Sequence, residues 1–239
     1  MLPPFTVVIP AYNEAERIGR TLTHVLEYLR AQSPGSEVIV VDDGSTDATA
    51  EVVRRVFAQT DGAEKRLIQH EPNRGKGAAV RDGLLAATRP IALFSDADLS
   101  APITEAPKLI DPINAGEVDV AFGSRALNRK LIGNRQAWYR EQGGRVFNLL
   151  VRLATGLPFW DTQCGFKAFR LDAFRPLLAK AQSDGFGFDV EFLYLAQRAG
   201  LRLREIPVRW DHNEGSKVSF MRDSRRMLEE VIAVRRNCA

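Results

Sequence analysis

The feature that most constrains the fold is an alternation of short apolar segments with longer, helix-like segments in the first half of the chain. The apolar segments are rich in Val and Ile on both faces, which is typical of strands in a covered parallel sheet. They lie at residues 6–10, 37–43, 65–70, 91–98 and 119–125. The segments between them predict helices at 14–30, 46–60 and 75–88. This order predicts an α/β protein with a doubly wound, mostly parallel sheet flanked by helices.

The second half of the chain has a different character. It opens with a basic, glycine-interrupted loop, which we expect to run into a helix at 145–156. A helix at 188–200, a strand at 201–210 and a closing helix at about 220–237 are expected after it. No internal repeat or linker divides the 239 residues, so we expect a single domain over 1–239.

Charge and cysteine content limit the function classes. Residues 1–120 carry 12 Lys and Arg against 18 Asp and Glu, whereas residues 121–239 carry 21 against 12. The basic half indicates an anionic partner such as a phosphorylated substrate or an acidic membrane surface. Nucleic acid is disfavoured because no recognition motif is present and the acidic half would repel phosphates. Two distant cysteines, with neither a signal peptide nor a membrane-spanning run in view, predict a cytoplasmic protein.

Polar clusters follow three of the predicted strands, at the sheet edge where open α/β proteins bind ligands. The third cluster contains Asp96 and Asp98, one residue apart. At a strand end both carboxylates can turn to one rim, which suits Mg²⁺ or Mn²⁺ shared with substrate phosphates. By itself the D-x-D pattern also occurs in solvated loops, and only the other clusters favour the metal site.

The second cluster contains Asp42 and Asp43, which could accept hydrogen bonds from a nucleobase or a ribose. The alternative is turn and capping chemistry, with a turn at Gly44 and a helix cap from Ser45 or Thr46. Both interpretations can hold together, since capping does not occupy every carboxylate.

The segment RGKGAAV at 74–80 places Lys76 at an expected helix start. Its spacing is not that of a P-loop, and no G-x-G-x-x-G follows the first strand, so a dinucleotide cofactor is disfavoured. Backbone N–H groups at that helix start could still bring Lys76 close to a phosphate.

Asp161 and Asp189 are each flanked by aromatic residues, where burial raises the pKa of a carboxyl group. Asp161 is a candidate for orienting an acceptor or for acting as a general base. The alternative is a structural role, as a helix cap or in an ion pair with Lys167 or Arg170. The three histidines are expected to be structural or exposed, so none is a poised base.

Taken together, IPAYNEAERI, VVDDGSTDAT, NRGKGAAVRDG and SDADLS resemble family 2 glycosyltransferases of the GT-A fold, in their order and their spacing. AFGSRA, WDTQCGFKAFR, GFDVEFLYLA and EIPVRWDHNEGSKV resemble the branch of dolichyl-phosphate β-glucosyltransferases and other polyprenyl-phosphate glycosyltransferases. The likeness covers nearly the whole chain. It implies a GT-A domain whose Rossmann-like half at 1–124 binds the nucleotide sugar and whose half at 125–239 binds the acceptor.

The resemblance also implies roles for individual residues. The donor's base and ribose would be lined by Pro10, Tyr12, Glu14 and Asp42. Asp96 and Asp98 would hold Mg²⁺ or Mn²⁺ against the diphosphate, with Lys217 closing over it. The acceptor's phosphate would be held by Arg125, Arg135 and Arg140.

The function implied is an inverting, metal-dependent transfer of a hexose onto a polyprenyl phosphate. Glucose from UDP-glucose is favoured, with GDP-mannose as the alternative donor. A lipid phosphate is already ionised, so positioning by arginines would matter more than a general base. The alternatives are a soluble acceptor, with Asp161 or Asp189 as base, and a non-catalytic nucleotide-sugar-binding protein.

A lipid acceptor also implies contact with a membrane, at its inner face for a cytoplasmic protein. We expect a peripheral surface in the arginine-rich 125–152 region. The apolar residues expected there are Leu131, Ile132, Trp138 and Phe147.

Overall fold

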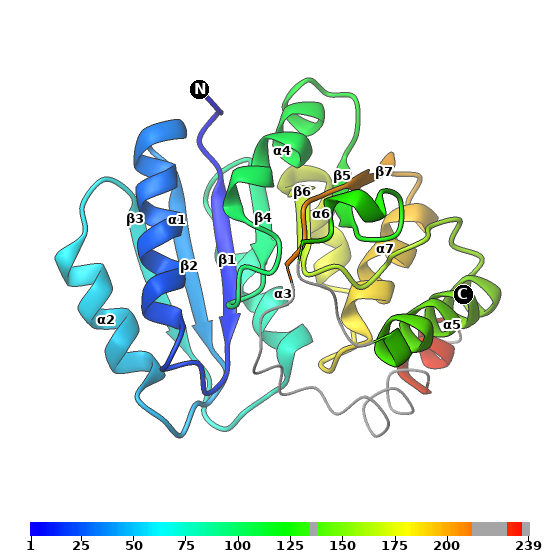
Figure 1. Ribbon diagram of the computed structural model, residues 1–239, viewed down its shortest axis with the longest axis horizontal. Coiled ribbons are helices and arrows are strands. Elements are labelled where there is room, and N and C mark those ends of the chain that lie inside the picture. The colour runs from blue at the N-terminus through cyan, green and yellow to red at the C-terminus, as the bar shows by residue number, and fades with distance from the viewer. Residues whose placement is uncertain (134–137, 212–228, 236–239) are drawn as a thin grey trace.

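The computed structural model describes residues 1–133, 138–211 and 229–235, without the side chains of 138–141 and 145. Its centre is one seven-stranded sheet of order β3-β2-β1-β4-β6-β5-β7 (Figure 1). The strands are β1 (Thr6–Ala11), β2 (Glu37–Asp42), β3 (Glu64–Gln69), β4 (Ile91–Ser95), β5 (Val120–Ser124), β6 (Phe166–Arg170) and β7 (Leu203–Pro207). β6 is antiparallel to β4 and β5, and every other pairing of these strands is parallel.

Helices cover both faces of this sheet. They are α1 (Ile18–Gln32), α2 (Thr49–Gln59), α3 (Lys76–Ala86), α4 (Ala106–Asn114), α5 (Trp138–Thr155), α6 (Leu171–Leu178) and α7 (Phe188–Arg198), with short 3₁₀ turns η1 (Ile103–Glu105) and η2 (Arg129–Leu131). One core cluster joins α1, α2 and α4 to one face, and a second joins α3, α5, α6, α7 and residues 231 and 234 to the other. None of the described helices is long and apolar enough to cross a bilayer.

The predicted α/β architecture is confirmed, including the five strands and three helices of the first half. The sequence patterns did not predict α4, α6 or β6. β6 reads Phe-Lys-Ala-Phe-Arg, and its charged residues hide a strand whose other side chains are buried. Residues 229–235 are helical, within the closing helix predicted at 220–237, and the rest of that range lies outside the described residues.

The antiparallel direction of β6 is what shapes the site. Phe166, at its beginning, pairs with Ser95 at the end of β4. The segment 161–165 therefore reaches the sheet edge formed by the carboxyl ends of the parallel strands. Residues from both halves of the chain meet there.

Candidate active site

Most of the predicted site residues lie along this edge. Pro10 is buried in β1, Tyr12 and Glu14 follow it, Asp42 ends β2 and Asp43 comes next, Lys76 begins α3, Asp96 and Asp98 follow β4, Arg125 follows β5, and Asp161 precedes β6. Arg135 and Lys217 lie outside the described residues, and Arg140 belongs to α5 with its side chain outside the description. Their predicted roles stay predictions.

The centre of the site is an ion pair between Asp96 and Lys76. Lys76 Nζ lies 2.6 Å from Asp96 Oδ1 and 5.5 Å from the centre of the Phe94 ring. Burial opposes the charge of Lys76, but the carboxylates of Asp96, Asp189 and Asp98 outweigh it and raise the pKa of the lysine. A fixed positive charge therefore stands beside the carboxylate pair.

The Asp96 side chain rests directly on Gly165. A β-carbon built on Gly165 would overlap the Asp96 carboxylate. The backbone is also joined here, since Asp96 N–H donates to Gly165 O at 3.1 Å. Next along the chain, Leu99 has a left-handed backbone (φ 47°), and Asp98 Oδ1 accepts from Ser100 N–H at 2.8 Å. This tight turn fixes the backbone that carries Asp96 and Asp98, and with it the directions of their side chains.

A second ion pair, fully buried, lies beneath the first. Lys167 on β6 donates to Asp189 Oδ1 on α7 at 2.5 Å and to Cys164 O at 2.6 Å. The Lys167 side chain has no exposed surface, and that of Asp189 is 7% exposed. Burial raises the pKa of Asp189, against the opposing charges of Lys167 and Lys76. Burial also raises the pKa of the Cys164 thiol to about 12, so this cysteine is no thiolate nucleophile.

Arg125 and Asp161 form a bidentate pair. The guanidinium donates from Nε at 2.7 Å and from Nη2 at 2.8 Å, and the Arg125 backbone N–H adds a third bond at 2.9 Å. Burial alone would raise the pKa of Asp161, but Arg125 outweighs it and holds that pKa below its ordinary value. The ion pair predicted as the alternative is real, but its partner is Arg125. Lys167 binds Asp189 instead, and Arg170 binds Asp119 and Asp172.

Glu205 on β7 fixes the segments that carry Arg125 and Asp161 through hydrogen bonds to its carboxylate. Its carboxylate accepts from Ser124 Oγ at 2.6 Å, from Asp161 N–H at 2.8 Å and from Trp160 N–H at 2.9 Å. The guanidinium of Arg125 also lies 5.5 Å from the centre of the Trp210 ring. Arg125 is thus held rigidly with its side chain 30% exposed at the edge of the sheet.

Asp42 and Asp43, neighbours in sequence, differ in their surroundings. Asp43 accepts from the backbone N–H groups of Arg74 at 2.9 Å and Gly75 at 2.8 Å, and lies 2.7 Å from His70 Nδ1. Its carboxylate thereby fixes the loop that leads to Lys76. Asp42 accepts from Ser45 N–H at 3.2 Å and from Gln69 Nε2 at 3.3 Å. The hydrogen bonds to Asp42 are therefore longer than those to Asp43, and both residues are buried.

The loop after β1 is clamped to the loop after β2. Asn13, with φ 55°, donates its N–H to Ser45 Oγ at 2.8 Å and accepts from Thr46 N–H at 2.8 Å. Helix α2 begins only at Thr49 and has no side-chain cap, so the predicted cap by Ser45 or Thr46 is wrong. Tyr12 is 44% exposed at the surface beside these two loops. The Glu14 carboxylate accepts a hydrogen bond from Arg17 Nη2 at 2.8 Å.

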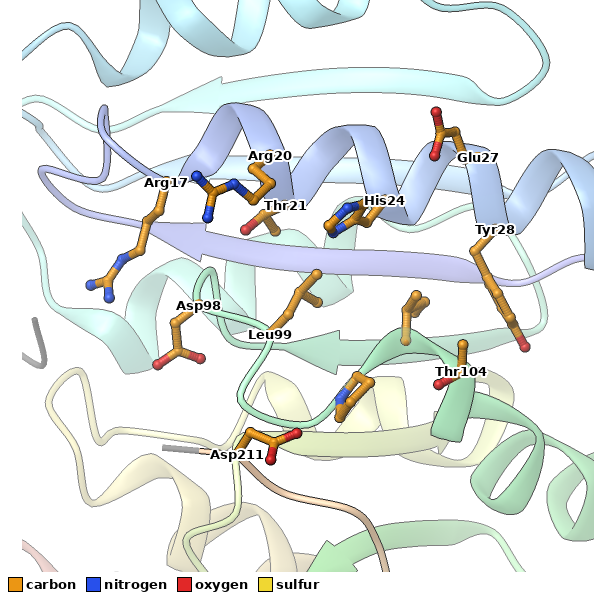
Figure 2. Close-up of a pocket in the computed structure, with 12 residues that line it drawn as sticks. Arg17, Arg20, Thr21, His24, Glu27, Tyr28, Asp98, Leu99, Thr104 and Asp211 are labelled. Carbon is orange, nitrogen blue, oxygen red and sulfur yellow. The ribbon is translucent and has the colours of Figure 1, made fainter. Parts of the chain in front are cut away.

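A groove of about 790 Å³ leads away from Asp98 between α1 and the segment 98–104 (Figure 2). Figure 2 shows Arg17, Arg20 and His24 along one side, with Asp98 and Asp211 on the other. The hydrogen-bonded Glu14 carboxylate raises the pKa of Arg17, and Asp98 and Asp96 add to the effect. Asp98 therefore opens into this groove, which Arg17 and Arg20 line on the opposite side.

Asn13, Gly165, Glu205 and the pairing of Lys167 with Asp189 were not identified from the sequence. The sequence around Lys167 gave some indication of its role, because this lysine interrupts the apolar stretch from Phe166 to Phe169. Nothing in the sequence pattern marks Gly165 or Glu205, because their importance comes from contacts with residues more than 40 positions away.

Comparisons with known proteins identify the family and support the fold. The chain is 38% identical to the dolichyl-phosphate β-glucosyltransferase of Drosophila melanogaster over 90% of its own length and 69% of that protein's. It is 35% identical to the Saccharomyces cerevisiae protein of the same name, over 96% of this chain and 73% of that one. Its fold matches glucosyl-3-phosphoglycerate synthase of Mycobacterium tuberculosis, solved with Mn²⁺, UDP and glucosyl-3-phosphoglycerate, with a TM-score of 0.72 and 21% identity over 97% of this chain and 79% of that one.

The family comparison covers the sheet edge described above. Residues 6–178 match glycosyl transferase family 2, a range that includes both aspartates of the D-x-D segment, Lys76, and the Arg125–Asp161 pair. The chain therefore belongs to glycosyl transferase family 2, is a glycosyltransferase of the GT-A fold, and is similar throughout to dolichyl-phosphate β-glucosyltransferases.

Proposed function

We propose that this glycosyltransferase moves glucose from UDP-glucose to a polyprenyl phosphate at a membrane surface, with inversion at the anomeric carbon and with Mg²⁺ or Mn²⁺ at Asp96 and Asp98. The relatives named as dolichyl-phosphate β-glucosyltransferases support both the sugar and the acceptor. A fold neighbour solved with Mn²⁺ and UDP-glucose supports the donor and the metal.

The described residues fit a divalent cation. Asp96 Oδ1 is buried and faces the Lys76 ammonium at 2.6 Å without a well-aligned hydrogen bond from the described residues, so a divalent cation here would share this carboxylate with Lys76. No group of three or more His, Cys, Asp or Glu side chains gathers as a metal site within the described ranges. A site with one or two protein carboxylates is what Mg²⁺ uses when substrate phosphates supply further ligands. When bound, the cation would offset the charge of the donor diphosphate.

The protein's own groups provide the rest of the donor site. Lys76 is held beside Asp96 and can stabilise the negative charge that develops on the departing diphosphate. Asp42 can accept from the base, and Tyr12 offers a ring surface for the base or ribose. The Asp43 carboxylate positions the loop that leads to Lys76.

The observation that carries the choice of acceptor is the bidentate Arg125–Asp161 pair. Asp161 is a poor general base, because Arg125 occupies its carboxylate and keeps its pKa low. An acceptor hydroxyl would need a base, whereas a phosphate monoester is already ionised near neutral pH. Arg125 uses Nε and Nη2 on Asp161 and retains other N–H groups for an anion. We therefore assign Asp161 the task of orienting Arg125 toward the acceptor phosphate.

The test is transfer measured with the purified protein, Mn²⁺, and labelled UDP-glucose or GDP-mannose, with or without a short-chain polyprenyl phosphate. We expect label to enter the lipid phase from UDP-glucose but not from GDP-mannose, and only when the polyprenyl phosphate is present. Chelation of the metal by EDTA should abolish the transfer. Transfer from GDP-mannose would overturn the assigned sugar. Donor turnover that is stimulated by soluble acceptors but not by the lipid would overturn the acceptor.

Gly165→Ala should weaken Mn²⁺-dependent donor binding by about 10- to 100-fold, the usual effect of disturbing a residue that orients a metal ligand. The added β-carbon displaces the Asp96 carboxylate, which is the group that can move. Titration of donor with and without Mn²⁺ measures the loss, and thermal unfolding shows whether the fold is kept. Gly144→Ala is the matched control, because a β-carbon there meets nothing within 4 Å. Unchanged metal-dependent affinity in Gly165→Ala would contradict the assignment of Asp96.

A further inference from the structure

Helix α5 carries an apolar stripe that faces solvent. Its members are Val146, Leu149, Leu150 and Leu153, spaced as one face of a helix, with 59%, 54%, 39% and 70% of each residue exposed. They account for four of the ten large apolar residues that are exposed in the described part of the chain. We call these four residues the α5 stripe.

The opposite face of α5 is apolar as well. Phe147 and Val151 are buried there with Val231 and Val234 of the helical segment 229–235. Figure 1 shows α5 and that segment together at the periphery of the molecule. A helix with apolar residues on two faces normally has both faces covered. Its inner face is covered by this chain, whereas no described residue covers its outer face, which is therefore open to contact with a partner surface.

The polar residues of this part of α5 do not interrupt the stripe. Asn148 turns inward, where its Oδ1 accepts from Thr162 Oγ1 at 3.3 Å. Arg152 lies against Trp160, with its guanidinium 4.2 Å from the ring centre. Trp160 is itself 56% exposed. An exposed Trp stacked with Arg beside an aliphatic stripe is a combination found at membrane–water interfaces.

Arginines border the stripe on α5 and on the segment 229–235. No Asp or Glu occurs between Glu141 and Asp161, whereas Arg145 and Arg152 do. Arg235 is exposed beside the end of α5, where it donates to Ala154 O at 3.3 Å. An apolar stripe bordered by the arginines described here, Arg152 and Arg235, complements an anionic lipid surface.

The stripe is also fixed relative to the acceptor site. Trp160 immediately precedes Asp161, which holds Arg125. The Asn148 contact ties α5 to the same segment. A bilayer on the stripe would therefore lie next to the arginine assigned to the acceptor phosphate.

We propose that the α5 stripe, with Trp160 and Arg152, is the surface by which this protein docks on an anionic lipid bilayer. This inference rests on the proposed function for its purpose, but its observations are independent of it. It replaces part of the surface expected from the sequence: Phe147 faces the core, Ile132 packs against it, and the side chain of Trp138 is outside the description. The stripe lies on the same helix, on the face opposite to Phe147.

The test is flotation of the protein with vesicles of phosphatidylcholine alone or with added phosphatidylglycerol, in the absence of donor and acceptor. We expect binding to the anionic vesicles and a loss of about tenfold or more in the double variant Leu149→Ser/Leu153→Ser. Arg152→Gln should reduce binding to the anionic vesicles specifically, and vesicles should shift the emission of Trp160 to shorter wavelength. Both leucines are more than half exposed, so the double variant should keep the fold, which circular dichroism checks.

Leu85→Ser is the matched control, because Leu85 is 43% exposed on α3, away from the stripe. Equal vesicle binding by the wild type and the double variant, or no binding by the wild type, would overturn the proposal. So would a wild-type dimer in light scattering that the double variant abolishes, because the occupant would then be a second copy. Since no substrate is present, a failure here is distinct from a failure of the transfer assay.

Discussion

Asp96→Asn should lower the rate of transfer by about 10²- to 10³-fold, the usual cost of removing one preorganised electrostatic group. Asn has nearly the shape of Asp, so the packing on Gly165 is kept while the negative charge is lost. The pair with Lys76 is lost with it, which leaves a lysine without the carboxylate that holds it in place. One substitution therefore affects both the proposed cation and Lys76.

The informative measurement is donor affinity as a function of Mn²⁺ concentration. In the wild type, Mn²⁺ should tighten UDP-glucose binding, and in Asp96→Asn that increase should disappear. Asp98→Asn should act in the same direction. Asp111→Asn, at an exposed position on α4, controls for the loss of one surface charge. If both active-site variants kept metal-dependent donor affinity, the site would have to be sought elsewhere.

The architecture and the position of Asp96, Asp98 and Lys76 at one sheet edge were predictable because they rest on local patterns. Strands buried on both faces are apolar throughout, and residues at their carboxyl ends gather at one edge. Asp96 and Asp98 follow such a strand, and the structure places Lys76 beside Asp96 there. These contacts follow from the order of the elements along the chain.

The contacts missed in the second half depend on pairings between distant residues. Arg125 and Asp161 are 36 positions apart, and Lys167 and Asp189 are 22 apart. A lysine in a short sequence reads as an exposed residue until its buried partner is known, and for that reason β6 went unrecognised. The outward face of α5 was misassigned for a related reason. When both faces of a helix are apolar, periodicity does not reveal which one meets the core.

Lys167→Met should destabilise the protein by about 3–5 kcal/mol, as is usual when one partner of a buried ion pair is removed. The Met side chain fills much of the space, so the loss is mainly electrostatic: Asp189 is left buried without its principal cation. At about 2–4 °C per kcal/mol for a chain of this size, the melting temperature should fall by roughly 6–20 °C. Chemical denaturation gives the free energy of unfolding directly.

The dependence on pH separates this cause from a packing defect. In the variant, the pKa of Asp189 in the folded protein should rise further above its value in the unfolded chain, about 3.9. The folded state then binds the extra proton, so the deficit is full at neutral pH and shrinks as the pH falls toward the unfolded value. A packing defect would give the same deficit at every pH.

Two further variants complete the comparison. Arg204→Met breaks an ion pair with Glu117 whose side chains are 46% and 54% exposed, and should cost no more than about 1 kcal/mol. Lys167→Met/Asp189→Leu removes both buried charges and should recover most of the lost stability. Donor binding should not recover with it, because Asp189 also lies in the field that keeps Lys76 charged beside Asp96. A double variant that regained both stability and donor affinity would show that the buried pair serves the fold alone.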